Sequence, residues 1–113
     1  MKKWIIVIWV IFQAALAIAQ ARGSISDRDA FKAIKNGDSE TVAQFIGQGN
    51  NINELYGRSE TTLLSYSIRR GQFNIAKYLL ENGADPDQES NGKTPLMYTV
   101  QYREPDIARL LIR

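Results

Sequence analysis

Residues 79–86 read Leu-Leu-Glu-Asn-Gly-Ala-Asp-Pro, and they carry the clearest structural signal in this chain of 113 residues. The leucine pair followed by Gly83 predicts a helix that ends in a left-handed residue, a conformation that glycine adopts without a Cβ penalty. Around this stretch, apolar residues recur at three- and four-residue spacing: Leu64, Ile68, Ile75, Ala76, Leu79 and Leu80. This spacing predicts short helices with one apolar stripe each, which no helix pair could bury alone.

The pattern occurs three times along the chain. Segment 62–80 recurs at 94–112 with a displacement of 32 residues, and an earlier copy lies 34 residues before it at 28–46. The two displacements differ only in the loop, because nine positions separate Asn53 from Thr62 and seven separate Asp87 from Thr94. Loops tolerate such changes, whereas an insertion inside a packed helix would rotate its apolar face away from its neighbours.

Helix boundaries are marked in each copy. Thr62 and Thr94 can each accept a backbone N–H at a helix start, and Pro95 stands in the first turn, where proline removes no hydrogen bond. Glycines follow the apolar stretches at positions 37, 49, 71 and 83. The chain is therefore predicted to form helix-turn-helix units joined by surface loops.

These residues resemble the ankyrin repeat, in which Thr-Pro-Leu-His opens an inner helix and Leu-Leu-x-x-Gly-Ala ends an outer helix. The resemblance implies an all-α solenoid of about three repeats, at residues 27–53, 54–87 and 88–113, with the last repeat incomplete. The family's His position holds Phe31, Ser65 and Met97, and Arg103 stands where glycine is expected. Since that His normally ties neighbouring repeats together, we expect a less rigid array.

The first residues have the outline of a secretory signal peptide. Two lysines precede the apolar run 4–12, and Ala17 and Ala19 are the small residues that the cleavage rule requires before Gln20. We expect a signal peptide at 1–19, cleavage between Ala19 and Gln20, and a linker at 20–26, with cleavage after Ala21 as the alternative. An uncleaved segment would instead anchor the protein in the inner membrane.

Composition excludes several kinds of chemistry. The chain has no cysteine and no histidine, so disulfides, thiolate metal sites and histidine-based catalysis are absent. We expect no enzyme activity, no cofactor and no metal site. Without residues 1–19, twelve basic and twelve acidic residues remain, which gives no support for binding of nucleic acid or, once the signal is removed, of a membrane.

Ankyrin repeats contact partners through loop tips and the exposed side of the inner helices. Carried over by position, the resemblance assigns candidate contacts in the first loop to Tyr56, Arg58 and Glu60, and in the second loop to Glu89, Asn91 and Lys93. On the inner helices it assigns Lys35, Asn36, Arg69, Arg70, Gln101 and Tyr102. Arginine and tyrosine are frequent anchors of protein interfaces.

These observations favour a periplasmic or secreted protein that binds another protein. The resemblance extends to exported bacterial ankyrin proteins, which in architecture and address are similar to immunity proteins, so an immunity protein that inhibits a toxin or enzyme is the function that we expect. The alternatives are a support protein in envelope or oxidative-stress defence and a fragment of a longer ankyrin protein. The third repeat also lacks a polar cap, so self-association through its open apolar face is expected if no further repeat covers it.

Overall fold

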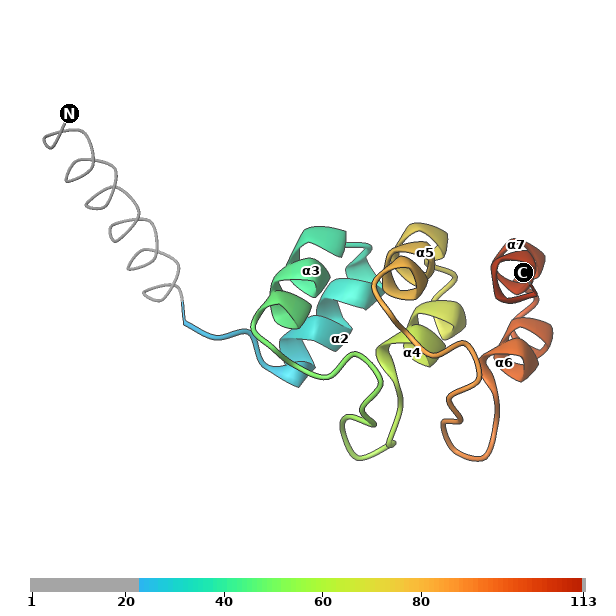
Figure 1. Ribbon diagram of the computed structural model, residues 1–113, viewed down its shortest axis with the longest axis horizontal. Coiled ribbons are helices and arrows are strands. Elements are labelled where there is room, and N and C mark those ends of the chain that lie inside the picture. The colour runs from blue at the N-terminus through green and yellow to red at the C-terminus, as the bar shows by residue number, and fades with distance from the viewer. Residues whose placement is uncertain (1–22, 113) are drawn as a thin grey trace, which may run out of the picture.

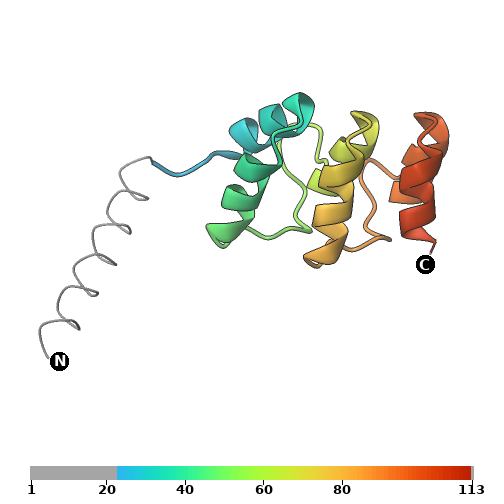
Figure 2. The same cartoon turned by 90° about the horizontal axis from the view of Figure 1, so that it is seen from above.

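A computed structural model describes residues 23–112 as six helices in two layers (Figure 1). Their bounds are α2 Asp27–Asn36, α3 Ser39–Gly47, α4 Leu63–Arg69, α5 Phe73–Glu81, α6 Pro95–Gln101 and α7 Pro105–Leu111. Helices α2, α4 and α6 form the inner layer, and α3, α5 and α7 form the outer layer (Figure 2). The predicted all-α solenoid of about three helix-turn-helix repeats is confirmed.

The last outer helix is shorter than the other two. Helix α7 has seven residues, whereas α3 and α5 have nine each. The predictions of a signal peptide at 1–19, of cleavage between Ala19 and Gln20, and of the first part of the linker lie outside the described residues. Among the helices of residues 23–112, none combines the length and the apolar character needed to cross a membrane.

The inner helices begin at side-chain caps, as the threonines predicted. The Thr62 hydroxyl oxygen accepts the N–H of Ser65 at 3.1 Å, and that of Thr94 accepts the N–H of Met97 at 3.3 Å. Ser26 caps α2 in the same way. Each cap supplies a partner for one of the N–H groups that a helix start leaves free.

Asp38 caps the outer helix α3 of the first repeat. Its carboxylate accepts the hydroxyl proton of Thr41 at 2.6 Å and the Thr41 N–H at 3.2 Å. These hydrogen bonds, the one from the hydroxyl first, hold the pKa of Asp38 below its ordinary value, because they favour the ionised carboxylate.

Tight turns between the two helices of a repeat depend on one left-handed residue. This residue is Gly37 in the first repeat, with φ of 74°, and Gly71 in the second, with φ of 67°. In the third repeat it is Arg103, with φ of 56°. The turn geometry is thus the same in all three repeats, although the third departs from glycine.

The hydrophobic core runs along the whole array and consists of one apolar stripe from each helix. Its buried members are Ala30, Ala33, Ile34, Val42, Phe45, Leu63, Leu64, Ile68, Ile75, Ala76, Leu79, Ala84, Tyr98 and Ile107. Each inner helix packs on the next inner helix, and each outer helix on the next outer helix. Stability therefore comes from stacking between neighbouring repeats.

Polar contacts also join the repeats along the loop side. The Asn53 amide donates to the carbonyl oxygen of Gly83 at 3.1 Å, and its side-chain oxygen accepts the Asp85 N–H at 2.6 Å. One side chain of the first repeat thus binds two backbone groups of the turn that ends the second.

Candidate protein-binding surface

Two short hairpins project from the inner layer, and they hold most of the loop residues predicted to contact a partner. Backbone hydrogen bonds pair Tyr56 with Thr61 at 3.0 and 3.1 Å, and Ser90 with Lys93 at 2.9 and 3.1 Å. The predicted contact residues Arg58, Glu60, Glu89, Asn91 and Lys93 are exposed in or beside them. The two hairpins also touch, since the Asn91 amide donates to the carbonyl oxygen of Ser59 at 2.7 Å.

Tyr56 has a different position from the rest of its loop. Its ring packs edge-on against Phe31 and Phe45, with ring centroids 6.4 and 5.5 Å away, and its hydroxyl donates to the Asn51 carbonyl oxygen at 2.6 Å. Burial raises the pKa of the Tyr56 phenol, with smaller contributions from the charges of Glu54 and Asp27. Tyr56 therefore holds the first loop onto the first repeat.

Two of the inner-helix candidates, Arg69 and Tyr102, lie close together. The guanidinium carbon of Arg69 lies 5.9 Å from the centroid of the Tyr66 ring and 5.9 Å from that of the Tyr102 ring. Tyr66 belongs to α4 and Tyr102 directly follows α6, so Arg69 links the second repeat to the third. Cation–π contacts of this kind are worth about 0.5–1 kcal/mol each at exposed sites.

Lys93 and Gln101 form a second contact, although they come from different segments. The Lys93 ammonium donates to the Gln101 side-chain oxygen at 2.7 Å and lies 5.8 Å from the centroid of the Tyr98 ring. Lys35, Asn36 and Arg70 are exposed at or next to the ends of α2 and α4.

Tyr66 was missed by the sequence analysis, although it contacts Arg69. The sequence does contain a signal for Tyr66, because an aromatic residue recurs at this position of the repeat. Its equivalent is Tyr98 in the third repeat, although the first repeat has Lys32 there. It also precedes Arg69 by three residues, which places the two on one face of a helix.

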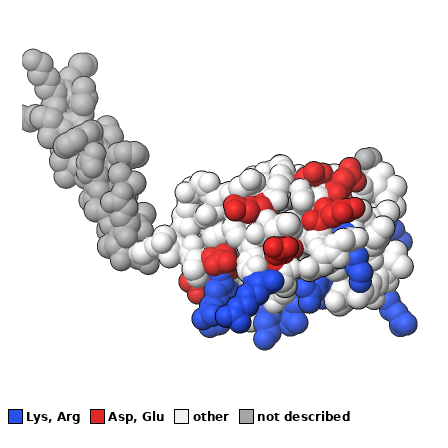
Figure 3. All heavy atoms as spheres, turned by 90° about the horizontal axis from the view of Figure 1, so that it is seen from below, with Lys and Arg blue, Asp and Glu red and all other residues white. Residues whose placement is uncertain are grey.

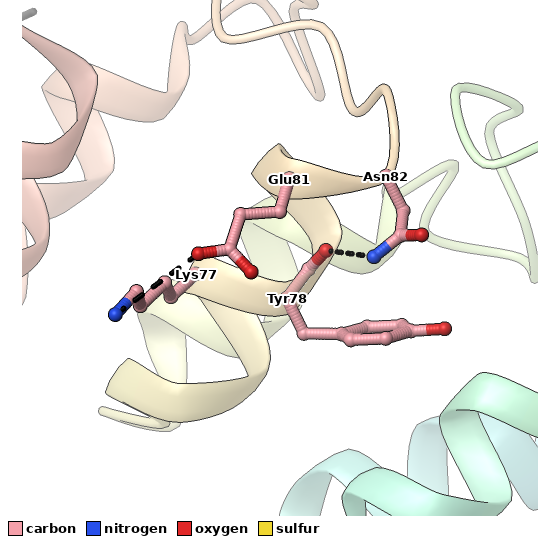
Figure 4. A network of polar contacts seen from close by, with 4 residues as sticks. All are labelled: Lys77, Tyr78, Glu81 and Asn82. Carbon is pink, nitrogen blue, oxygen red and sulfur yellow. Dashed lines mark hydrogen bonds and ion pairs between the residues drawn. The ribbon is translucent and has the colours of Figure 1, made fainter.

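Charges are distributed unevenly over the molecule. Viewed from below, Lys and Arg gather along the lower edge of the molecule, and most Asp and Glu lie above them (Figure 3). Within residues 23–112, the ion pairs are Lys77 with Glu81 and Arg109 with Asp106, all four on the outer helices. The Lys77 ammonium and the Glu81 carboxylate are 4.0 Å apart. Figure 4 shows this pair beside the Asn82 amide, which donates to the Tyr78 carbonyl oxygen.

Within residues 23–112, no three Asp, Glu, His or Cys side chains lie close enough together to hold a metal ion.

Residues 30–113 match the family described as "Ankyrin repeats (3 copies)". The chain belongs to the ankyrin-repeat family. A human ASB11 ankyrin repeat domain superposes with a TM-score of 0.63 at 27% sequence identity, over 74% of this chain and 38% of that one.

Curated relatives match this chain over only part of their own length. A putative ankyrin repeat-containing protein of Treponema pallidum is 31% identical over 102 residues, which is 89% of this chain and 33% of that protein. Protein HOS4 of Saccharomyces cerevisiae is 32% identical over 77 residues, which is 67% of this chain and 7% of that protein. The chain thus spans a third or less of the length of these relatives.

The third ankyrin repeat presents an uncovered apolar face. Val100 is 75% exposed, whereas Ile68, its equivalent in the second repeat, is fully buried by the third repeat. Leu96 and Met97 are also exposed, although their equivalents Leu64 and Ser65 are buried. Ile112 extends this face, which we call the open face and define as Leu96, Met97, Val100 and Ile112.

Proposed function

We propose that this ankyrin-repeat chain binds another protein through its inner surface, formed by the exposed sides of α2, α4 and α6 and by the two hairpins. Ankyrin repeats are generally protein–protein interaction modules. The observation that carries the proposal is the cluster of Tyr66, Arg69 and Tyr102. Arginine and tyrosine side chains are here held in place next to solvent, which is the composition of an interface anchor.

Capture of a partner tests this proposal. The full chain, tagged at its C-terminus, would be recovered from its own host with everything that it retains, and the retained proteins identified by mass spectrometry. Arg69→Glu with Arg70→Glu should abolish capture at a temperature at which circular dichroism shows the variant folded, although loss of the Arg69 contacts with Tyr66 and Tyr102 should lower its melting temperature. Retained capture by this variant would exclude the inner surface.

A matched control makes the result specific. Lys77→Glu with Arg109→Glu makes the same change of charge on the outer helices α5 and α7 and should capture the partner as wild type does. Both pairs that it breaks are solvent-exposed, so their contribution to stability is small. Equal loss in both variants would show an effect of net charge alone.

Export to the periplasm or beyond is the second part of the proposal. It is supported by the two lysines, the apolar run 4–12 and the small residues Ala17 and Ala19. In the captured bait, an N-terminal peptide that begins at Gln20 would establish cleavage. A bait that begins at Met1 would contradict it and favour an N-terminal anchor.

Inhibition of a toxin or enzyme is the mode of action that we propose for the complex. A binding module without catalytic groups acts by occupying its partner's surface, and an immunity protein does this in equal amounts with one target. A single partner at equal amount supports this role. Several weakly held partners would favour the envelope or oxidative-stress alternative.

Self-association through the open face is proposed as a further property, because this face leaves large apolar side chains in water. Light scattering on the full chain should give a dimer or a larger species, which Val100→Lys with Ile112→Lys would convert to a monomer. A wild-type monomer would overturn this part of the proposal.

A further inference from the structure

Three cations occupy one row across the three repeats. Lys35 and Arg69 hold the same position in the first and second repeats, in the last turns of α2 and α4. The equivalent residue of the third repeat is Gln101, which binds the Lys93 ammonium at 2.7 Å. The third repeat therefore also presents a positive charge at this position, and we call Lys35, Arg69 and Lys93 the cation row.

The row is free to bind a ligand in the described part of the chain. Within residues 23–112, no ion pair involves these three cations and no hydrogen bond uses the Arg69 guanidinium. Stacking on Tyr66 and Tyr102 fixes the position of this guanidinium while its N–H groups stay available at the edge. A carboxylate could therefore bind Lys35 or Arg69 without first displacing another partner, and the Lys93 ammonium has two N–H donors besides the one that Gln101 accepts.

The charges of the rest of the molecule do not explain the row. Residues 23–112 carry ten basic and twelve acidic side chains, so the row stands against a slightly negative background. Lysine and arginine in a last turn do offset the helix dipole, but Lys93 precedes α6 and has no such role. Residues 20–113 carry twelve basic and twelve acidic side chains, and this balance gives no support for nucleic acid, whose binding depends on neutralising many phosphates.

We propose that the cation row recognises an acidic segment of the partner protein, with carboxylates three residues apart. Neighbouring packed helices lie about 8–10 Å apart. A partner segment in the polyproline II conformation has three residues per turn and advances about 9 Å in each turn. Every third side chain of such a segment, laid across the inner helices, therefore faces the next repeat. This inference rests on the proposed function, and it adds the charge and the spacing of the segment that is bound.

Selection of peptides on the purified full chain tests the charge and the spacing together. A library of random displayed peptides would be selected for binding, and the selected sequences should be enriched in Asp and Glu at three-residue intervals. Lys35→Glu with Arg69→Glu should weaken binding of a selected peptide by about tenfold or more, while Lys77→Glu with Arg109→Glu should not. Raised salt should weaken binding too, because exposed charges are screened.

The other outcomes distinguish failure of the acidic segment from failure of the inner surface as the binding site. Selection of neutral or basic peptides would overturn the proposal of an acidic segment. If the Lys35→Glu, Arg69→Glu variant no longer bound these peptides, the inner surface would remain the binding site. Peptides that bind both double variants equally would exclude the inner surface, and with it the proposed function. Absence of any enrichment, or tighter binding of a single-stranded oligonucleotide, would overturn the acidic segment. Unchanged circular dichroism melting of both variants would show that folding is not the cause.

Discussion

Ser90 connects the second and third repeats through one buried hydroxyl group. Its oxygen accepts the Thr62 N–H at 3.1 Å and lies 3.2 Å from the Ser65 hydroxyl oxygen. Ser65 stands where the family has histidine, and its substitution led us to expect a weaker tie. The structure shows that Ser90 supplies a contact between these repeats, and the less rigid array stays a prediction.

Replacing Ser90 with alanine is expected to lower the free energy of unfolding by about 1–3 kcal/mol, because the buried Thr62 N–H would lose its partner. Urea denaturation followed by circular dichroism measures this change. Ser24→Ala, at an exposed serine of the N-terminal linker, is the control and should leave the transition midpoint unchanged. Equal midpoints for both variants would contradict the role of Ser90.

The sequence predicted the roles of single residues in caps and turns better than it predicted contacts between residues. Thr62, Thr94 and the glycines were identified because capping and left-handed turns depend on one residue each. Ser90 was not identified, since its contact with Ser65 joins residues 25 positions apart. The contact of Lys93 with Gln101, only eight positions apart, was missed for another reason: a flexible side chain leaves no spacing pattern.

The turn between α6 and α7 differs from the other two turns of its kind. Arg103 adopts the left-handed conformation that Gly37 and Gly71 adopt in the first two repeats. In a residue with a Cβ atom this conformation costs about 1–2 kcal/mol. The third repeat therefore has the only strained turn of the three in residues 23–112.

Arg103→Gly is expected to raise the free energy of unfolding by about 0.5–1 kcal/mol, because relief of this strain exceeds the entropy that glycine loses on folding. Arg103→Ala removes the same side chain but keeps the Cβ, and should give no gain. Thermal melting of both variants measures the difference. A gain with alanine as large as that with glycine would show that the side chain, and not the backbone, is responsible.

The hairpins are the elements that the sequence described least well. Residues 54–62 and 88–94 were predicted only as tolerant loops, yet both contain a backbone-paired hairpin. Their left-handed positions include Glu60 and Asn91, and glutamate in particular gives no signal for such a conformation. The helices were predicted better, because a stripe of buried side chains imposes a period along the whole element.

The same position of the repeat contributes differently to the stability of the molecule, depending on whether a further repeat covers it. Ile68 is fully buried between the second and third repeats, whereas Val100, its equivalent, is 75% exposed on the open face. The sequence analysis predicted an open apolar face on the third repeat. It could not predict which side chains form the open face until the repeats were placed side by side.

Alanine at these two positions is therefore expected to have unequal effects. Ile68→Ala should lower the free energy of unfolding by about 2–5 kcal/mol, through lost burial and a residual cavity. Val100→Ala should change it by less than about 0.5 kcal/mol, as for other exposed sites. Urea denaturation at low protein concentration measures both, and a large loss with Val100→Ala would mean that the open face is covered in solution.

Stacking of each repeat on its neighbour also sets the mechanical behaviour of the molecule. A force applied at the two ends passes from α2 through α4 to α6, so the stacking interfaces bear it in series. Springs in series extend mainly at the softest member, and the peak force reports that member alone. Stiffening only the stiffer of the two interfaces would therefore leave the extensibility of the whole array nearly unchanged, whereas stiffening the softer one would reduce it.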